Sequence, residues 1–167
     1  SLAGSRVDKR GLWEALIPSM GYMALLRNLR NFDEAGVSDE VVQQVAARLA
    51  DPAQVARSRQ FPLRFLAAHR SCVSLRWAYA LEQALNASLA NIPELPGRTL
   101  VLVDQSGSMS MALSKKSQMR FAEAAAIFGA AIAARNLGRV TLVQYGSDSE
   151  IVKVRRGESL LRILERF

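Results

Sequence analysis

Residues 98–110, RTLVLVDQSGSMS, decide how this chain of 167 residues can fold. Four apolar residues at 100–103 end abruptly at Asp104, and a cluster of serines with one glycine follows. This pattern predicts a buried strand that opens into a turn. The next segment, 117–136, is rich in alanine and predicts a helix. The turn should therefore lie at the C-terminal edge of a parallel sheet, where open α/β sheets bind ligands.

The turn itself has the form Asp-x-Ser-x-Ser. Small hard cations such as Mg²⁺ prefer oxygen ligands in a near-octahedral array. Asp104, Ser106 and Ser108 could supply half of such a shell, and Gly107 would let the turn bend closely around the ion. The alternative is an ordinary strand-to-helix turn with capping serines.

The remaining C-terminal part predicts two more strands, at 139–145 and 150–154, and a final helix at 158–167. The turn at 146–149 should join the two strands as a hairpin at the edge of the sheet. Three strands and two helices make half of a doubly wound domain, so the sheet should be incomplete in this chain.

The N-terminal part reads as a series of short helices. We expect them at 11–17, 19–31, after the cap residue Ser38, after Asp51-Pro52, and at 63–70 and 74–90. Short loops between antiparallel helices are typical of α-solenoids. The segment NIPELPG at 91–97 marks a boundary. The predicted organisation is a helical module at 1–92, a linker at 93–97 and a partial α/β domain at 98–167.

Composition favours an anionic partner. The net charge is +7 and the isoelectric point about 10.3, which points most simply to nucleic acid. Of the 22 basic residues 18 are arginine, however, and a GC-rich genome would produce the same bias.

No apolar run could span a bilayer and no signal peptide is recognisable, so we expect a soluble, cytoplasmic protein. The lone Cys72 predicts a buried thiol with no redox role.

The distribution of charge is more informative than its sum. No Asp or Glu occurs between Pro52 and Leu81, whereas basic and aromatic residues alternate there. The basic side chains of such a surface can bind the phosphates of single-stranded RNA, and its aromatic rings can stack on the bases. We expect Phe65 and Trp77 to be core residues and the basic side chains to bind. The candidate RNA-binding residues are Arg57, Arg59, Arg64, His69, Arg70 and Arg76, with Arg27 and Arg30 as a possible extension.

The same residues argue against an enzyme. A nucleophile elbow needs Gly-x-Ser-x-Gly, but Asp104 and Ser108 stand at the two glycine positions. An aspartyl-phosphate phosphatase would need a second carboxylate where Ser106 stands. The sole histidine, His69, lies in the helical part, away from the serines.

Three segments, in this order and spacing, resemble the Ro RNA-binding proteins of the TROVE family, including the bacterial Ro orthologues. They are IPSMGYMALLRNLRNFDEAGVSDE at 17–40, SRQFPLRFLAAHR at 58–70 and TLVLVDQSGSM at 99–109. The last is similar to the metal-ion-dependent adhesion site (MIDAS) of von Willebrand factor A (vWA) domains. The resemblance covers essentially residues 11–167.

This resemblance implies a ring of HEAT-like helical repeats closed by a vWA domain. It implies binding of Y-like small RNAs on the outside and of single-stranded 3′ ends of misfolded RNAs in the central hole. It also implies a partnership with a 3′ exoribonuclease, polynucleotide phosphorylase, in RNA quality control.

The chain departs from that pattern because it ends before the threonine and the second aspartate that complete the family's metal site. We therefore expect either a fragment of a longer protein, with the rest of the ring outside this chain, or a remnant that could not form the ring. The resulting hypothesis is a non-catalytic RNA-binding scaffold with an incomplete Mg²⁺ site. The alternatives are a metal-dependent protein-adhesion module and a metal that only stabilises the loops.

Overall fold

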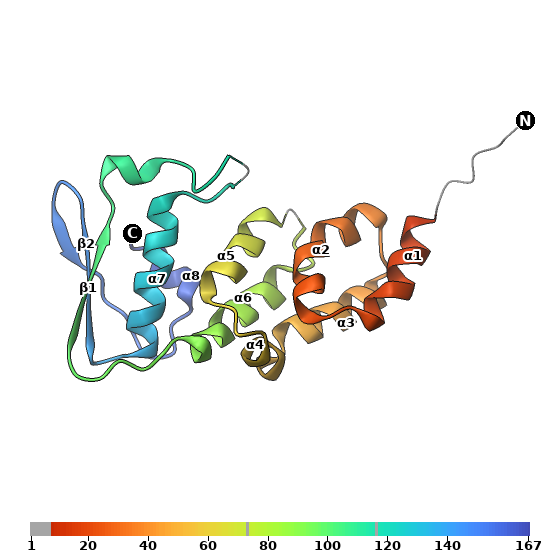
Figure 1. Ribbon diagram of the computed structural model, residues 1–167, viewed down its shortest axis with the longest axis horizontal. Coiled ribbons are helices and arrows are strands. Elements are labelled where there is room, and N and C mark those ends of the chain that lie inside the picture. Colours follow the sequence, from red (N-terminus) through yellow and green to blue (C-terminus); the bar gives the residue numbers. More distant parts are fainter. Residues whose placement is uncertain (1–7, 73, 116) are drawn as a thin grey trace, which may run out of the picture.

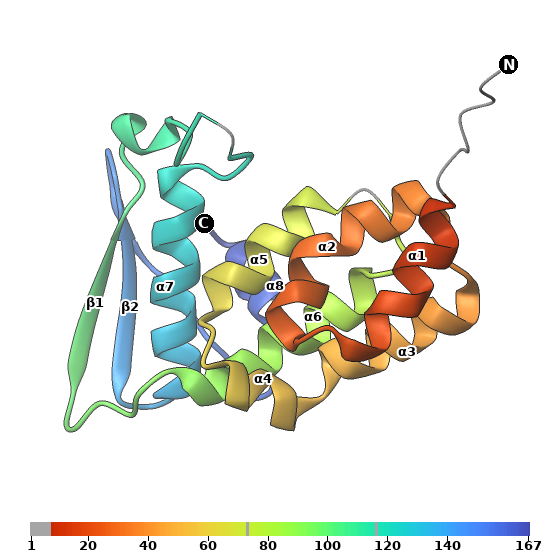
Figure 2. The same ribbon diagram turned by 45° about the vertical axis from the view of Figure 1, so that its right-hand side comes forward.

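The computed structural model describes residues 8–72, 74–115 and 117–167. A row of helices leads to a small sheet at one end of the molecule, and helix α7 lies between the two (Figures 1 and 2). The helical part contains α1 (Lys9–Leu16), η1 (Ile17–Ser19), α2 (Tyr22–Ala35), α3 (Asp39–Ala50), α4 (Pro52–Ser58), α5 (Pro62–Ser71), α6 (Ala78–Ala87) and η2 (Ser88–Asn91), where η denotes a short 3₁₀ helix. The second part contains β1 (Thr99–Asp104), η3 (Gly107–Ser110), α7 (Phe121–Arg135), β2 (Val140–Tyr145), β3 (Ser149–Ile151) and α8 (Leu160–Leu164).

Local signals explain where several helices begin. The Ser38 hydroxyl accepts a hydrogen bond from the Val41 N–H at 3.4 Å and caps α3. The Asp51 carboxylate accepts one from the Ala53 N–H at 2.9 Å, and Pro52 is the first residue of α4. Both predicted helix starts are confirmed. Helix α2 runs to Ala35, beyond the predicted end at 31, and stops at Gly36 in the left-handed conformation with φ of 67°.

The predicted helix at 74–90 is wrong at its start, because α6 begins only at Ala78. The residues before it form a turn, in which the Ser74 hydroxyl accepts a hydrogen bond from the Arg76 N–H at 3.2 Å. The Trp77 indole N–H donates to Asp33 at 2.9 Å, more than forty positions earlier in the chain. One local and one long-range hydrogen bond therefore accompany the turn that replaces the predicted first turn of the helix. The last helix, α8, is also shorter than predicted.

The three strands form one mixed sheet in the order β1-β2-β3. Strands β1 and β2 are parallel, with Thr99 opposite Val140 and Asp104 opposite Tyr145. Strand β3 is antiparallel to β2, which confirms the predicted hairpin at the sheet edge. The third strand is shorter than predicted and ends at Ile151.

Helix α7 covers one face of this sheet. Val103 and Leu142 point toward the helix and are 3% and 2% exposed. Leu100 and Leu102 point to the opposite face and are 61% and 59% exposed. The strand predicted as buried is thus buried on one face only. Within the described ranges no helix lies on the outer face, so the doubly wound arrangement is not seen (Figure 2).

The helical and sheet parts share one buried hydrophobic cluster, which runs from Ile17 to Ile163. The Asn86 side chain at the end of α6 accepts a hydrogen bond from the Leu160 N–H of α8 at 2.9 Å. The buried Asn136 side chain accepts the Leu95 N–H at 2.7 Å and donates to the Pro93 carbonyl, so the linker is held against the end of α7. Of the helices in the described ranges, none has the length and apolar character that crossing a membrane requires.

At Gly129, helix α7 leaves no room for a side chain between itself and the sheet. A Cβ atom there would lie 2.4 Å from Val103 Cγ2 and 3.0 Å from Leu142 Cδ1. We expect Gly129→Ala to lower the free energy of unfolding by about 1–3 kcal/mol, because the helix must move away from the sheet. Thermal unfolding followed by circular dichroism measures the loss.

Gly21→Ala is the matched control, since a Cβ atom there meets no other atom within 4 Å. A Gly129→Ala variant as stable as the wild-type chain would show that the α7–sheet contact has room for a side chain.

Candidate functional site

The predicted metal-binding residues lie on the turn that leaves β1. Asp104 ends the strand, and Ser106 precedes η3, which contains Ser108. The Asp104 carboxylate accepts the Ser106 N–H at 2.8 Å. The Ser106 and Ser108 hydroxyl oxygens lie 3.2 Å apart. The structure therefore brings the three predicted residues together at the end of the parallel pair.

The electrostatics of this turn favour a charged carboxylate. The Ser106 N–H, followed by the Ser106 hydroxyl, lowers the pKa of Asp104. Asp104 is consequently ionised at neutral pH and partly exposed. Neighbouring ligands of an octahedral Mg²⁺ ion, each about 2.1 Å from the metal, lie about 3 Å apart. The two serine hydroxyls are hydrogen-bonded to each other, and their distance is close to the spacing of such a pair.

Two contacts hold the turn in place. The Gln105 amide donates to the Ala122 carbonyl in the first turn of α7 at 3.1 Å, and the Gln105 N–H donates to the Tyr145 carbonyl of β2 at 2.8 Å. The described residues contain no cluster of three or more His, Cys, Asp or Glu side chains that could hold a metal ion. The oxygen atoms that this turn brings together are those of one carboxylate, Asp104, and two hydroxyls, Ser106 and Ser108.

The predicted RNA-binding arginines fall into two groups. Arg57 lies in α4, Arg59 follows it in the left-handed conformation with φ of 53°, and Arg64 lies in α5. Together with Arg27 of α2 they are exposed, and none of the four makes an ion pair with a described acidic residue. These four guanidinium groups are open to an anionic ligand.

The other arginines of the prediction are engaged within the protein. Arg30 pairs with Glu34 at 2.9 Å, and Arg70 of α5 pairs with Glu123 of α7 at 3.4 Å. The Arg30–Glu34 pair is exposed and the Arg70–Glu123 pair is partly exposed, so both are open to solvent and contribute little to stability. His69 is half-buried, and its Nδ1 atom is buried without a hydrogen-bond partner among the described residues.

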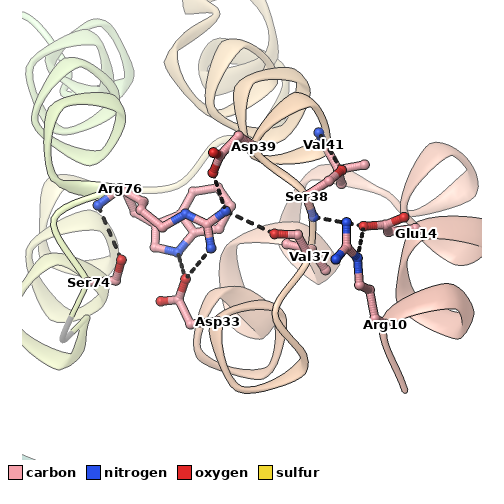
Figure 3. Close-up of polar contacts among 10 residues, drawn as sticks. Arg10, Glu14, Asp33, Val37, Ser38, Asp39, Val41, Ser74 and Arg76 are labelled. Carbon is pink, nitrogen blue, oxygen red and sulfur yellow. Dashed lines mark hydrogen bonds and ion pairs between the residues drawn. The ribbon is translucent and has the colours of Figure 1, made fainter. Parts of the chain in front are cut away.

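Arg76 is the most heavily bonded of the predicted residues (Figure 3). Its Nη2 atom donates to the Val37 carbonyl and to Asp39, both at 2.9 Å, and its Nη1 atom lies 3.8 Å from Asp33. On the other side of the same loop, Glu14 accepts the Ser38 N–H at 2.7 Å, which lowers the pKa of Glu14. The loop between α2 and α3 is thus bonded from two directions, and Arg76 acts there as a structural link.

The aromatic residues between Pro52 and Leu81 form a buried pair and an exposed pair. Phe65 and Trp77 are fully buried, which confirms them as core residues, whereas Phe61 and Tyr79 are 48% and 75% exposed. Cys72 is half-buried, and burial raises its pKa, in agreement with an unreactive thiol.

Sequence reasoning missed a groove of about 450 Å³ between α5 and α7. Phe128 of α7 forms part of its wall and is 42% exposed. Because α7 is rich in alanine and apolar on all sides, its sequence pattern does not indicate which of its residues are exposed. Only the packing of α7 beside α5 shows that Phe128 faces the same hollow as Arg64.

Comparisons with known proteins place these features in a family context. The TROVE domain matches residues 2–77. Telomerase protein component 1 of Mus musculus is 44% identical over 68 residues, which cover 40% of this chain and 3% of that protein. The RNA-binding protein RO60 of Caenorhabditis elegans is 30% identical over 128 residues, which cover 68% of this chain and 20% of that protein.

The similarity extends to the three-dimensional fold. The crystal structure of the Deinococcus radiodurans Ro (RSR) protein superimposes with a TM-score of 0.76 and 26% identity, over 94% of this chain and 35% of that one. The helices and the small mixed sheet therefore have the arrangement of a Ro protein. The present chain spans only about a third of that structure and smaller shares of the curated relatives.

The structural role of Arg76 is testable. We expect Arg76→Ala to lower the free energy of unfolding by about 1–2 kcal/mol, because the partly buried Val37 carbonyl and Asp33 lose a charged donor. Arg57→Ala, which removes an exposed guanidinium with no ion-pair partner among the described residues, should change it by less than about 0.5 kcal/mol. Chemical denaturation of both variants measures the difference. If the two variants are equally stable, the bonds of Arg76 to the loop between α2 and α3 contribute nothing to the free energy of unfolding.

Proposed function

Because the chain belongs to the Ro/TROVE family, we propose that it is part of a non-catalytic RNA-binding scaffold of the Ro ribonucleoprotein type. Its ligands would be Y-like small RNAs and the single-stranded ends of misfolded or structured RNAs. We further propose that it presents such RNAs to a 3′ exoribonuclease, polynucleotide phosphorylase being the candidate, as part of cytoplasmic RNA quality control.

One observation carries the RNA-binding proposal. The TROVE match at residues 2–77 contains all eight candidate basic residues, and four of them, at positions 27, 57, 59 and 64, have no acidic partner in the described structure. Arg57, Arg59 and Arg64 lie on the consecutive helices α4 and α5 and the turn that joins them. Unpaired guanidinium groups at neighbouring positions repel one another, and bound phosphates relieve that repulsion.

The two parts of the chain have different roles in this proposal. The helices α1 to α6 would be the last repeats of a HEAT-like solenoid, and the sheet with α7 and α8 would be the first half of a vWA domain. The parallel pair β1-β2 with its crossover helix α7, and the serine-rich turn at its end, support the second assignment.

The turn after β1 would hold a Mg²⁺ ion through Asp104, Ser106 and Ser108. A bound divalent cation would supply positive charge and open coordination positions at the sheet edge.

A second function of a different class follows from this geometry. If a partner protein's carboxylate completes the shell, the turn serves metal-dependent protein adhesion, and the observation that favours it is the accessibility of the turn, where Ser108 is exposed and Asp104 and Ser106 are partly exposed.

The RNA proposal predicts that charge at α4 and α5 controls affinity. The triple variant with Arg57, Arg59 and Arg64 changed to alanine should bind a single-stranded RNA oligonucleotide at least about tenfold more weakly. The slope of log affinity against log salt concentration should fall by about 2, because three phosphate contacts are lost. Fluorescence anisotropy over a salt series measures both quantities.

A matched control removes the same charge elsewhere. Arg139, Arg156 and Arg162 are exposed, lie in the C-terminal part and make no ion pair with described residues. Their triple alanine variant should keep most of the affinity and the slope. If both variants lose affinity equally, net charge and not the α4–α5 surface governs RNA binding.

The metal proposal predicts separable effects of one carboxylate. Asp104→Ala should abolish Mg²⁺ binding measured by isothermal titration calorimetry, since the lone charged ligand of the half shell is removed. RNA affinity should change less than about twofold, with or without EDTA. Glu150→Ala, an exposed carboxylate on β3, is the control. A large loss of RNA affinity in Asp104→Ala or in EDTA would mean that the metal turn contacts RNA.

A further inference from the structure

The groove between α5 and α7 carries an inference beyond the arginine surface. One wall comes from α5 and the turn before it, with Phe61 and Arg64, and the other from the segment leading into α7 and from α7 itself, with Leu113 and Phe128. In both ribbon views α5 lies beside α7 (Figures 1 and 2). The volume of about 450 Å³ lies within the range of about 300–1,000 Å³ typical of small-molecule sites.

The apolar side chains of these walls remain in contact with water. Phe61, Phe128 and Leu113 are 48%, 42% and 36% exposed, although Phe65 on the same helix as Arg64 is fully buried. Leu113 is fixed at the groove because its N–H donates to the Met119 carbonyl at 2.8 Å. Exposed apolar groups gathered in one hollow are typical of binding sites, because a ligand that covers them gains the free energy of their burial.

The charged residues that line the groove indicate which class of ligand it can bind. No acidic residue lines it, and Arg64 lines it without an ion-pair partner among the described residues. Arg57 and Arg59 lie directly before it in the chain. A ligand with a flat apolar ring joined to a negative group matches this combination of aromatic walls and a basic rim.

Two polar side chains add hydrogen-bonding capacity at the wall. The Gln60 amide nitrogen donates to the Ser58 carbonyl at 3.0 Å, which leaves the Gln60 amide oxygen as an acceptor. The Ser117 hydroxyl accepts the Met119 N–H at 3.0 Å, so its own hydrogen can be donated to a ligand. One acceptor and one donor suit the polar edge of a nucleobase.

We propose that this groove is a nucleobase-stacking site, in which an unpaired base of single-stranded RNA stacks on Phe61 and Phe128 while Arg64 binds its phosphate. The inference rests on the proposed RNA-binding function and assigns to it residues beyond the basic surface. Bases in a duplex are stacked on their neighbours and cannot enter, so the site recognises single strands only.

The test compares aromatic with aliphatic walls in the full chain. Phe61→Leu and Phe128→Leu keep an apolar side chain and remove the ring. Each should weaken binding of a single-stranded oligonucleotide by about 5-fold to 100-fold, the effect of losing one stacked base. The salt dependence should stay unchanged, whereas Arg64→Ala should reduce the slope by about 0.7. Binding of duplex RNA should be equal in all Phe variants and wild type.

Two controls keep the outcome specific. Tyr79→Leu changes an aromatic residue that is 75% exposed on α6, outside the groove, and should leave affinity unchanged. Phe61→Tyr keeps the ring and should keep the affinity. Thermal unfolding of each variant shows whether it is folded, and photo-crosslinking of a thiouridine oligonucleotide to the wild-type chain should label the groove.

The outcomes separate the two proposals. If the wild-type chain binds single-stranded RNA and both Leu variants bind it equally well, the stacking site is wrong and the RNA-binding function stands. If the groove instead binds an acidic, aromatic peptide and the variants lose only that ligand, the stacking site is also wrong. If the wild-type chain binds no RNA, both proposals fail together.

Discussion

The contact between α7 and the sheet at Gly129 is the constraint on which the rest of this structure depends. Because no side chain separates the helix from Val103 and Leu142, α7 can lie directly on β1 and β2. Its first turn then reaches the loop after β1, where Gln105 bonds to the Ala122 carbonyl. Its opposite side meets α5. One helix therefore positions both the hydroxyl-rich turn and one wall of the α5–α7 groove.

The elements that depend on local chemistry were predictable from the sequence. Ser38 and the Asp51-Pro52 pair start helices through bonds to residues two or three positions away, and the hairpin of β2 and β3 follows from a short polar turn. The start of α6 was not predicted, because Arg76 and Trp77, which precede it, donate side-chain hydrogen bonds to the distant Val37 and Asp33. A local pattern contains no information about partners so far away.

The candidate sites show the same division. Asp104, Ser106 and Ser108 lie within five consecutive positions, so a single turn brings them together and the sequence motif identifies them. The arginines were recognisable as a group, but their individual states depend on tertiary structure: Arg64 is open to solvent, whereas Arg76 is bonded to the α2–α3 loop. Phe128 was not recognisable, because nothing within α7 distinguishes it from the buried apolar residues around it.

The parallel register of β1 and β2 also has a consequence for the order in which the chain folds. Thr99 meets Val140 only after the whole intervening crossover has closed, and closing so long a loop carries an entropic cost before any strand contact forms. Within α1 to α6 some contacts join sequence neighbours, as between α1 and α2 or α5 and α6, whereas α3 packs on α6 across the helices between them. Asp104 lies opposite Tyr145 at the end of this strand pair, so the geometry of the turn after it depends on the closure of that long crossover.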